Sequence, residues 1–195
     1  ARMRETLGAL AQARFIEGGA AISRRVLDEV GRARVVMAFV PMRRGGRLME
    51  ADITDLLDGV VTAGKRLALA RGTSDGGVEA CEVGEDWRGE VVESALKGVM
   101  EPAATARRVA AAEIDVVIVP GLAFDAMGGR LGRGKGFYDR FLGELKDSAR
   151  IPKPALIGVC LEEQVVGEVP REGHDVLVGC VVTDVRTMRV AALGT

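Results

Sequence analysis

The stretch IDVVIVPG, residues 114–121, is the strongest strand signal in the chain. Its apolar run is unbroken from Val116 to Val119, so it lacks the polar alternation of a strand with one face in water. Such a run is typical of a parallel strand that is covered on both faces. In open parallel sheets, ligands bind beyond the carboxyl ends of the strands. The stretch therefore predicts an α/β fold with a functional loop after Gly121.

Strand and helix patterns alternate along the rest of the chain. Further strands are predicted at residues 34–40, 65–70, 77–83, 154–160 and 176–185. Apolar residues spaced three and four apart predict helices at residues 4–15, 20–30, 51–64, 104–113 and 137–147. We expect Gly18-Gly19 to break the first two helices apart. This order predicts a three-layer α/β/α sandwich with a mostly parallel central sheet, folded as one domain over residues 1–195.

Composition excludes several classes of protein. The 195 residues are 48% hydrophobic and 28% charged, and the formal net charge is −1, without the positive excess of a general nucleic-acid binder. No apolar run reaches the roughly 18 residues of a membrane span. We expect the protein to be a monomer that binds neither nucleic acid nor membrane. The chain shows no signal peptide and begins at Ala1 rather than Met, so we expect its true start to lie upstream.

The cysteines predict a reducing compartment. There are three of them, Cys81, Cys160 and Cys180, with no C-x-x-C pair, which favours neither a disulfide framework nor a zinc cluster. Cys160 and Cys180 lie in apolar runs and are expected to be small core residues. A cytoplasmic location follows as the expectation.

The loop RLGRGKGFYD, residues 130–139, follows the central strand and concentrates glycine with positive charge. Gly132, Gly134 and Gly136 allow close backbone approach and the φ values that turn successive N–H groups toward an anion. The predicted helix at residues 137–147 would point its positive end at the same place. Arginine and lysine side chains add full charges. These features together favour a polyphosphate ligand.

Known phosphate motifs fit the loop only in part. Residues 129–135 satisfy G-x-x-x-x-G-K, but Gly136 replaces the P-loop Ser or Thr that binds magnesium. The Rossmann pattern fails because Phe137 replaces its last glycine. Asp139 could replace the missing magnesium ligand, or could simply stabilise the helix dipole. A solvated basic turn and a nucleic-acid loop are alternatives; the second is weakened by an aromatic content of 4%.

The segment VPGLAFDAMGGRLGRGKGFYDRFL, residues 119–142, closely resembles the signature of the 5-formyltetrahydrofolate cyclo-ligase family. Three further segments resemble the family in order: EADITDLL (50–57), MEP (100–102) and ALIGVCLEEQVVGEVPREGHDVLV (155–178). The resemblance implies a three-layer α/β fold similar to the CoA-transferase and ribose-phosphate-isomerase type. It implies conversion of 5-formyltetrahydrofolate to 5,10-methenyltetrahydrofolate, with ATP as co-substrate, Mg²⁺ as cofactor, and ADP and phosphate as products. The formyl oxygen would be phosphorylated before the ring closes.

The resemblance also implies roles for individual residues. ATP would be bound by Arg4 and by Arg130, Leu131, Gly132, Arg133, Gly134, Lys135, Gly136, Phe137 and Tyr138. The folate would contact Val40, Glu50 and the loop from Arg133 to Phe137, with the Glu50 carboxylate accepting from the N–H donors of the pterin. Arg133 and Lys135 would stabilise the charge on the transferring phosphoryl group. Asp139 and Asp175 would bind Mg²⁺.

Some positions depart from the family pattern. Phe137 stands where Tyr is usual, the lysine that partners Arg4 would precede Ala1, and RRGGR (residues 43–47) resembles an insertion beside the folate site. Phe137 and the missing lysine motivate a second hypothesis, a non-catalytic protein that binds nucleotide or folate. A third is a sugar-phosphate enzyme of the same broad fold. Trp87 could stack on a pterin, but it is expected to be a packing residue.

Overall fold

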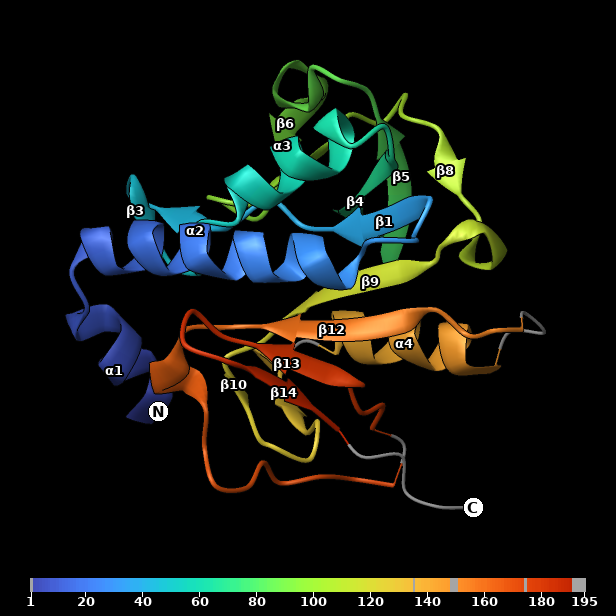
Figure 1. Cartoon of the computed structure of the whole chain (residues 1–195). Coiled ribbons are helices and arrows are strands. Elements are labelled where there is room, and N and C mark those ends of the chain that lie inside the picture. Colours follow the sequence, from blue (N-terminus) through green and yellow to red (C-terminus); the bar gives the residue numbers. More distant parts are fainter. Residues whose placement is uncertain (1, 135, 148–150, 174, 191–195) are drawn as a thin grey trace.

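The computed structural model describes residues 2–134, 136–147, 151–173 and 175–190, and its main element is a large mixed sheet (Figure 1). Its strands are β1 (Val35–Ala38), β4 (Arg66–Gly72), β5 (Val78–Val83), β8 (Arg108–Val109), β9 (Val116–Pro120), β12 (Ala155–Val159), β13 (Cys180–Val182) and β14 (Thr187–Arg189). Among the described residues it is eight-stranded, in the order β14-β13-β12-β9-β1-β4-β5-β8. The strands from β13 to β4 are parallel, while β14, β5 and β8 pair antiparallel. The predicted mostly parallel sheet is confirmed, with β9 near its centre.

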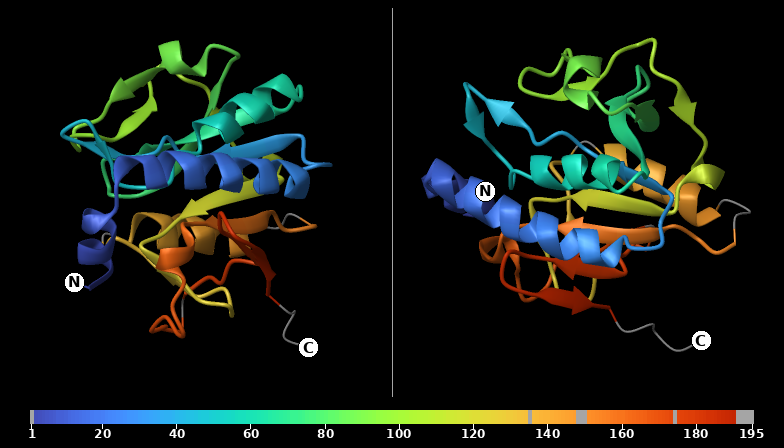
Figure 2. Two further views of the ribbon diagram at one scale, coloured as in Figure 1. Left: turned by 60° about the vertical axis from the view of Figure 1, so that its left-hand side comes forward. Right: turned by 45° about the horizontal axis from the view of Figure 1, so that its top comes forward.

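Helices cover both faces of this sheet. They are α1 (Arg2–Ala9), α2 (Gln12–Glu29), α3 (Thr54–Thr62) and α4 (Phe137–Asp147), with short 3₁₀ turns η1 (Trp87–Glu90), η2 (Ala111–Glu113) and η3 (Glu162–Gln164). The buried side chains of α2 and α3 belong to one core cluster, and those of α4 belong to a second. Figures 1 and 2 show α2 and α3 on one face and α4 on the other. The predicted three layers are therefore confirmed.

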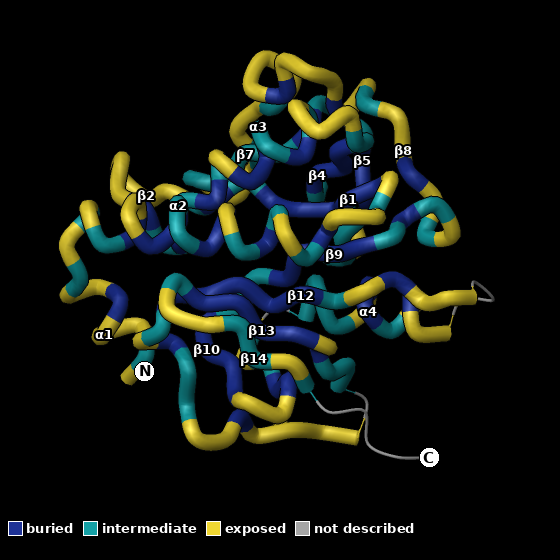
Figure 3. The backbone as a smooth tube through the Cα atoms, viewed as in Figure 1, coloured by how far each residue is buried: buried dark blue, intermediate teal, exposed yellow. Residues whose placement is uncertain are grey.

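Among the described residues, three short hairpins lie outside the main sheet. They are β2 (Arg43–Arg44) with β3 (Arg47–Leu48), β6 (Val91–Glu93) with β7 (Met100–Pro102), and β10 (Ala123–Phe124) with β11 (Arg130–Leu131). The first follows β1 and the third follows β9, so both arise at the carboxyl ends of parallel strands. The tube coloured by burial shows the sheet strands largely buried and the β2–β3 turn exposed (Figure 3).

The side chains expected in the core are found there. Cys81, Cys160 and Cys180 are all free and buried, and burial raises the pKa of the Cys160 thiol, so it stays protonated. Trp87 is only 3% exposed, and its Nε1 donates to Asp58 Oδ1 at 2.9 Å. It is a packing residue, as expected. Among the described helices, none has both the length and the apolar character needed to cross a membrane.

The predicted break at Gly18-Gly19 is wrong, because α2 runs through both glycines and the chain breaks instead between Ala9 and Gln12. A Cβ on Gly19 would lie 2.1 Å from the backbone oxygen of Asp52, and one on Gly18 would lie 2.4 Å from Leu161. The glycines let α2 approach the segment before α3 closely, and Asp52 N donates to Phe15 O at 2.9 Å. Tertiary packing explains these two glycines.

The helix predicted at residues 104–113 is also wrong. The chain there forms the edge strand β8 and the turn η2. Arg107 and Arg108 bind carboxylates of β5, with Arg107 Nη2 2.5 Å from Glu82 and Arg108 Nε 2.5 Å from Glu79. Pairing with β5 outweighs the helix propensity of this alanine-rich segment, since propensity is a weak preference that tertiary context overrides.

The close contact at Gly19 predicts a sharp difference between two Gly→Ala substitutions in helices. Gly19→Ala should lower the free energy of unfolding by about 3 kcal/mol, because backbone must move to admit the methyl group. Gly143→Ala in α4 meets nothing within 4 Å and should raise it by about 0.5–1 kcal/mol. Urea unfolding followed by circular dichroism measures both. Equal effects of the two substitutions would contradict the packing argument.

Candidate functional site

A small pocket lies at the carboxyl ends of the central parallel strands. Its lining comprises Phe39, Glu50, Ala51, Pro120, Gly121, Val159 and Gln164. The strands β1, β9 and β12 thus contribute through residues at or just beyond their last positions. Gln164 is held beside the chain after β9, since its Nε2 donates to Gly121 O at 3.0 Å and to Leu122 O at 3.2 Å. The pocket lies at the sheet edge where the sequence predicts the functional loop.

Two of the three glycines in the loop have the backbone conformation that the sequence predicts. Gly134 and Gly136 have φ values of +88° and +67°, in the region that side chains disfavour. Apart from their chain neighbours, no described residue has an atom within 4 Å of where a Cβ would stand on either glycine. Gly132 lacks a positive φ and instead lies beside the Arg130 guanidinium. Lys135 lies outside the described residues.

An ion pair joins the glycine loop to the segment after the β2–β3 hairpin. Arg133 Nη2 lies 3.0 Å from Glu50 Oε1 and 3.2 Å from Met49 O, across 83 or more residues of sequence. The other oxygen, Glu50 Oε2, accepts from Met42 N at 3.0 Å. Arg4 Nη2 donates to Arg133 O at 3.2 Å. Three residues predicted to contact substrates, Arg4, Glu50 and Arg133, are therefore brought together.

Arg130 and Tyr138, from the same segment, place polar groups in buried positions. The Arg130 side chain is 6% exposed, forms a close ion pair with Asp139, and reaches Pro120 O at 3.4 Å. It thereby ties the first turn of α4 to the end of β9. Burial, and then the nearby Glu50 charge, raise the pKa of Tyr138, whose buried hydroxyl has no hydrogen-bond partner among the described residues. An unsatisfied buried hydroxyl beside the loop is the kind of group that a polar ligand would engage.

The remaining predicted contacts occupy the margins of the site. The Phe137 ring lies beside Gly76 of the β4–β5 turn, and Arg140 Nη1 donates to Asp75 O at 3.1 Å. Leu131 is 41% exposed, and Val40 is half-buried against the core cluster that contains Phe39. Both fit a contact surface for an apolar part of a ligand.

The two carboxylates expected to bind magnesium are in different settings. Asp139 is in the first turn of α4 and pairs with Arg130. Asp175 belongs to the turn that begins at Glu172, where its Oδ2 accepts from Glu172 N at 2.8 Å. Within the described part of the chain, no group of three or more His, Cys, Asp or Glu side chains could hold a metal. Mg²⁺ that is bound mainly by phosphate oxygens needs only one or two carboxylates, but one oxygen of Asp139 is already paired with the Arg130 guanidinium.

Asp125 is a site-organising residue that the sequence analysis did not identify. It is fully buried, and its carboxylate accepts from Met127 N, Gly129 N and Val169 N at 2.8–2.9 Å and from Arg171 at 2.8 Å. Burial alone would raise the pKa of Asp125, but these hydrogen bonds together lower it. The carboxylate fixes the turn between β10 and β11, and so the position at which Arg130 enters the site. The Asp-x-x-Gly-Gly spacing is a turn signal that could have revealed it.

A parallel sheet with a glycine-rich basic loop beyond its carboxyl ends is typical of α/β proteins that bind anionic ligands. The chain belongs to the 5-formyltetrahydrofolate cyclo-ligase family, whose model it matches over residues 1–184. It is 34% identical to the 5-formyltetrahydrofolate cyclo-ligase of Mycolicibacterium smegmatis over 157 residues, which are 78% of this chain and 75% of that protein. It is 47% identical to the Saccharomyces cerevisiae enzyme of the same name over 70 residues, but these cover only 35% of this chain and 33% of the yeast protein.

Solved structures share the fold. The NMR structure of Aquifex aeolicus 5,10-methenyltetrahydrofolate synthetase aligns with a TM-score of 0.75 and 26% identity, over 100% of this chain and 92% of that one. A 5,10-methenyltetrahydrofolate synthetase from Mycoplasma pneumoniae aligns with a TM-score of 0.68 at 16% identity, over 94% of each chain, and supports the fold alone. The expected likeness to CoA-transferases and ribose-phosphate isomerases is not tested by these comparisons and stays a prediction.

The buried carboxylate predicts a pH-dependent loss of stability in Asp125→Asn. A folded-state pKa below the unfolded value, about 3.9, means that ionised Asp125 stabilises the fold fully above that value. This stabilisation is lost as the pH falls through the folded pKa. At pH 7, Asp125→Asn should lower the free energy of unfolding by about 3 kcal/mol, since it leaves Arg171 and backbone donors without their carboxylate.

Urea unfolding at pH 7 and at pH 3 tests this expectation. The difference between the wild type and Asp125→Asn should shrink at the lower pH. Asp147→Asn, on the exposed last turn of α4, serves as the matched control and should change little at either pH. A pH-independent difference for Asp125→Asn would show that its charge is not what stabilises the turn.

Proposed function

We propose that this protein converts 5-formyltetrahydrofolate to 5,10-methenyltetrahydrofolate with ATP as co-substrate, releasing ADP and phosphate. The observation that carries the proposal is the ion pair between Arg133 of the glycine loop and Glu50 beside the pocket. It brings the loop suited to a polyphosphate next to the carboxylate suited to the N–H donors of a pterin. Membership of the family supports the same substrates.

The chemistry needs positioning more than a side-chain nucleophile. The formyl oxygen attacks the γ-phosphorus and ADP leaves; N10 then attacks the activated carbon, loses its proton, and phosphate departs with the former formyl oxygen. Phosphorylation makes this oxygen a good leaving group. Arg133 and Lys135 stabilise the charge on the transferring phosphoryl group, and the N–H groups of the loop hold the nucleotide. We propose these roles for the loop from Arg130 to Tyr138, with Arg4 holding the loop backbone or a phosphate.

Arg130 fits a positioning role within this proposal. Its guanidinium is already engaged with Asp139 and Pro120 O, so it holds the first turn of α4 where the phosphates would bind. Asp139, with Asp175, is proposed to hold Mg²⁺, which when bound neutralises phosphate charge. Val40 and Phe137 are proposed to contact the folate. We also propose a monomer in a reducing compartment such as the cytoplasm, which the free, buried cysteines favour.

The direct test is the absorbance of the methenyl product. Purified protein given 5-formyltetrahydrofolate should produce it only when ATP and Mg²⁺ are both present. Lys135→Ala should lower kcat/KM at least about 100-fold, because a charge that stabilises the transition state is lost. Lys146→Ala, on the exposed last turn of α4, should leave it unchanged. Tight binding of either substrate with no product would favour the non-catalytic binder, and binding of a phosphorylated sugar without need of ATP would favour the sugar-phosphate enzyme.

The role of Glu50 predicts a split between the two substrates. Glu50→Gln keeps the shape of the side chain but removes the charge that the pterin N–H groups and Arg133 face. We expect KM for 5-formyltetrahydrofolate to rise about 10-fold or more, since a hydrogen bond to a charged group contributes about 1.5–3 kcal/mol. KM for ATP should change less than about threefold, and Glu144→Gln, exposed on α4, should alter neither. A rise in KM for ATP alone would place Glu50 at the nucleotide.

A further inference from the structure

Two residues that are proposed to serve different substrates bind each other. Arg133 is proposed to stabilise the transferring phosphoryl group, and Glu50 to hold the pterin. Arg133 Nη2 and Nε lie 3.0 Å and 3.3 Å from the same oxygen, Glu50 Oε1. The Glu50 side chain is 14% exposed and that of Arg133 is 34% exposed. The ion pair is thus partly shielded from water, which makes it stronger than a pair on an open surface.

The ion pair occupies the part of Glu50 that a pterin would use. Oε1 accepts from two N–H groups of Arg133, one for each of its lone pairs, and Oε2 accepts from Met42 N at 3.0 Å. A carboxylate that holds two parallel N–H donors uses both of its oxygens. The N–H donors of a pterin must therefore take the place of the Arg133 guanidinium at Oε1.

The same contact occupies the part of Arg133 that a phosphate would use. Nε and Nη2 face Glu50, and Nη2 also donates to Met49 O at 3.2 Å. A guanidinium binds a phosphate with pairs of N–H groups that lie on one edge of the fork. Glu50 and a phosphoryl group therefore compete for the same donors of Arg133.

The glycine loop allows the Arg133 side chain to change partners. Gly134 and Gly136 follow it with positive φ values, and neither is packed against another described residue at its Cα. Arg4 Nη2 donates to Arg133 O at 3.2 Å, so the backbone is held while the long side chain can rotate. Two arrangements follow, one with Arg133 on Glu50 and one with both groups available to ligands.

We propose that Glu50 couples the binding of the two substrates by holding Arg133 until either substrate separates them. The inference rests on the proposed function, since it assigns the pterin to Glu50 and the phosphoryl group to Arg133. Folate on Glu50 releases Arg133 for ATP, and ATP on Arg133 releases Glu50 for folate. The first ligand alone bears the cost of breaking the ion pair, so each substrate strengthens the binding of the other. The factor is the same in both directions.

The test measures binding of AMP-PNP with Mg²⁺ by calorimetry, because the γ-phosphate of this ATP analogue is not transferred. In the wild type, saturating 5-formyltetrahydrofolate should lower Kd for AMP-PNP about 10-fold. Glu50→Gln weakens the hold on Arg133, since a hydrogen bond to a charged group is about twice as strong as a neutral one. This variant should bind AMP-PNP alone about 5-fold more tightly than the wild type does. Saturating folate should then change its Kd for AMP-PNP less than about twofold.

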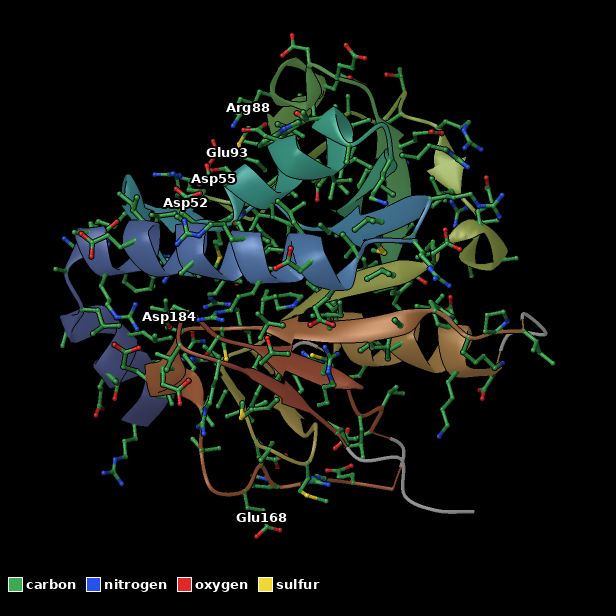
Figure 4. All side chains as sticks on the ribbon, in the orientation of Figure 1. Asp52, Asp55, Arg88, Glu93, Glu168 and Asp184 are labelled. Atoms are coloured by element: carbon green, nitrogen blue, oxygen red, sulfur yellow. The ribbon has the colours of Figure 1, made fainter. Side chains whose placement is uncertain are left out.

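The control is a carboxylate that does not contact Arg133. Asp55 lies exposed in the first turn of α3 and is labelled beside that helix in Figure 4. Asp55→Asn removes the same charge as Glu50→Gln, and should bind AMP-PNP as the wild type does and keep the effect of folate. An equal gain of affinity in Asp55→Asn would overturn the proposal, because lower negative charge would then explain the gain without release of Arg133.

Two further results would also overturn the coupling. They are a wild type whose Kd for AMP-PNP is the same with and without folate, and a Glu50→Gln variant that binds AMP-PNP no more tightly than the wild type. Failure of the proposed reaction is a separate outcome. If the coupling and its loss are both observed but ATP gives no methenyl product, the reaction fails and the coupling stands. If product forms without coupling, the reaction stands and the coupling fails.

Discussion

The parallel pairing of β9 between β1 and β12 is the constraint on which the rest of the site depends. Parallel neighbours end at the same edge of a sheet, so the chain that follows each strand must turn at that edge. The β2–β3 hairpin follows β1, the glycine loop follows β9, and η3 follows β12. Glu50, Arg133 and Gln164 come from these three connections. Glu50 and Gln164 line the same pocket, and Arg133 pairs with Glu50.

The parts of the fold that could be predicted are those that local pattern determines. The apolar run of β9 is buried on both faces, and Gly134 and Gly136 adopt the positive φ values for which glycine is suited. The parts that could not be predicted depend on distant contacts. Gly18-Gly19 resembles a helix break until Asp52 is known to lie against it. The segment at residues 104–113 has the local pattern of a helix, but part of it pairs with β5 as the edge strand β8, and this contact cannot be seen in the local pattern.

The same distinction holds within the site. The sequence indicated which residues could bind an anion, but their internal partners could not be predicted from spacing. Arg130 is held by Asp139, and Asp125 organises the turn that precedes it through donors at Val169 and Arg171. These interactions join segments separated by up to 46 residues and depend on burial as well as on residue type. Charge density in a loop therefore identifies a candidate site, while the partners of each charge distinguish positioning residues from residues available to a ligand.

The arginines in and near the site differ in how far their charge is neutralised by partners. Arg130 is buried and paired, so its charge is used to hold the fold together. Arg133 is partly exposed and shares Glu50, so a ligand could compete for it. Arg44 and Arg47 are exposed, with no acidic partner among the described residues. Unbalanced positive charge thus increases from Arg130, through Arg133, to Arg44 and Arg47. In a chain with a net charge of −1, such local imbalance, rather than overall charge, would orient a ligand that is anionic at one end.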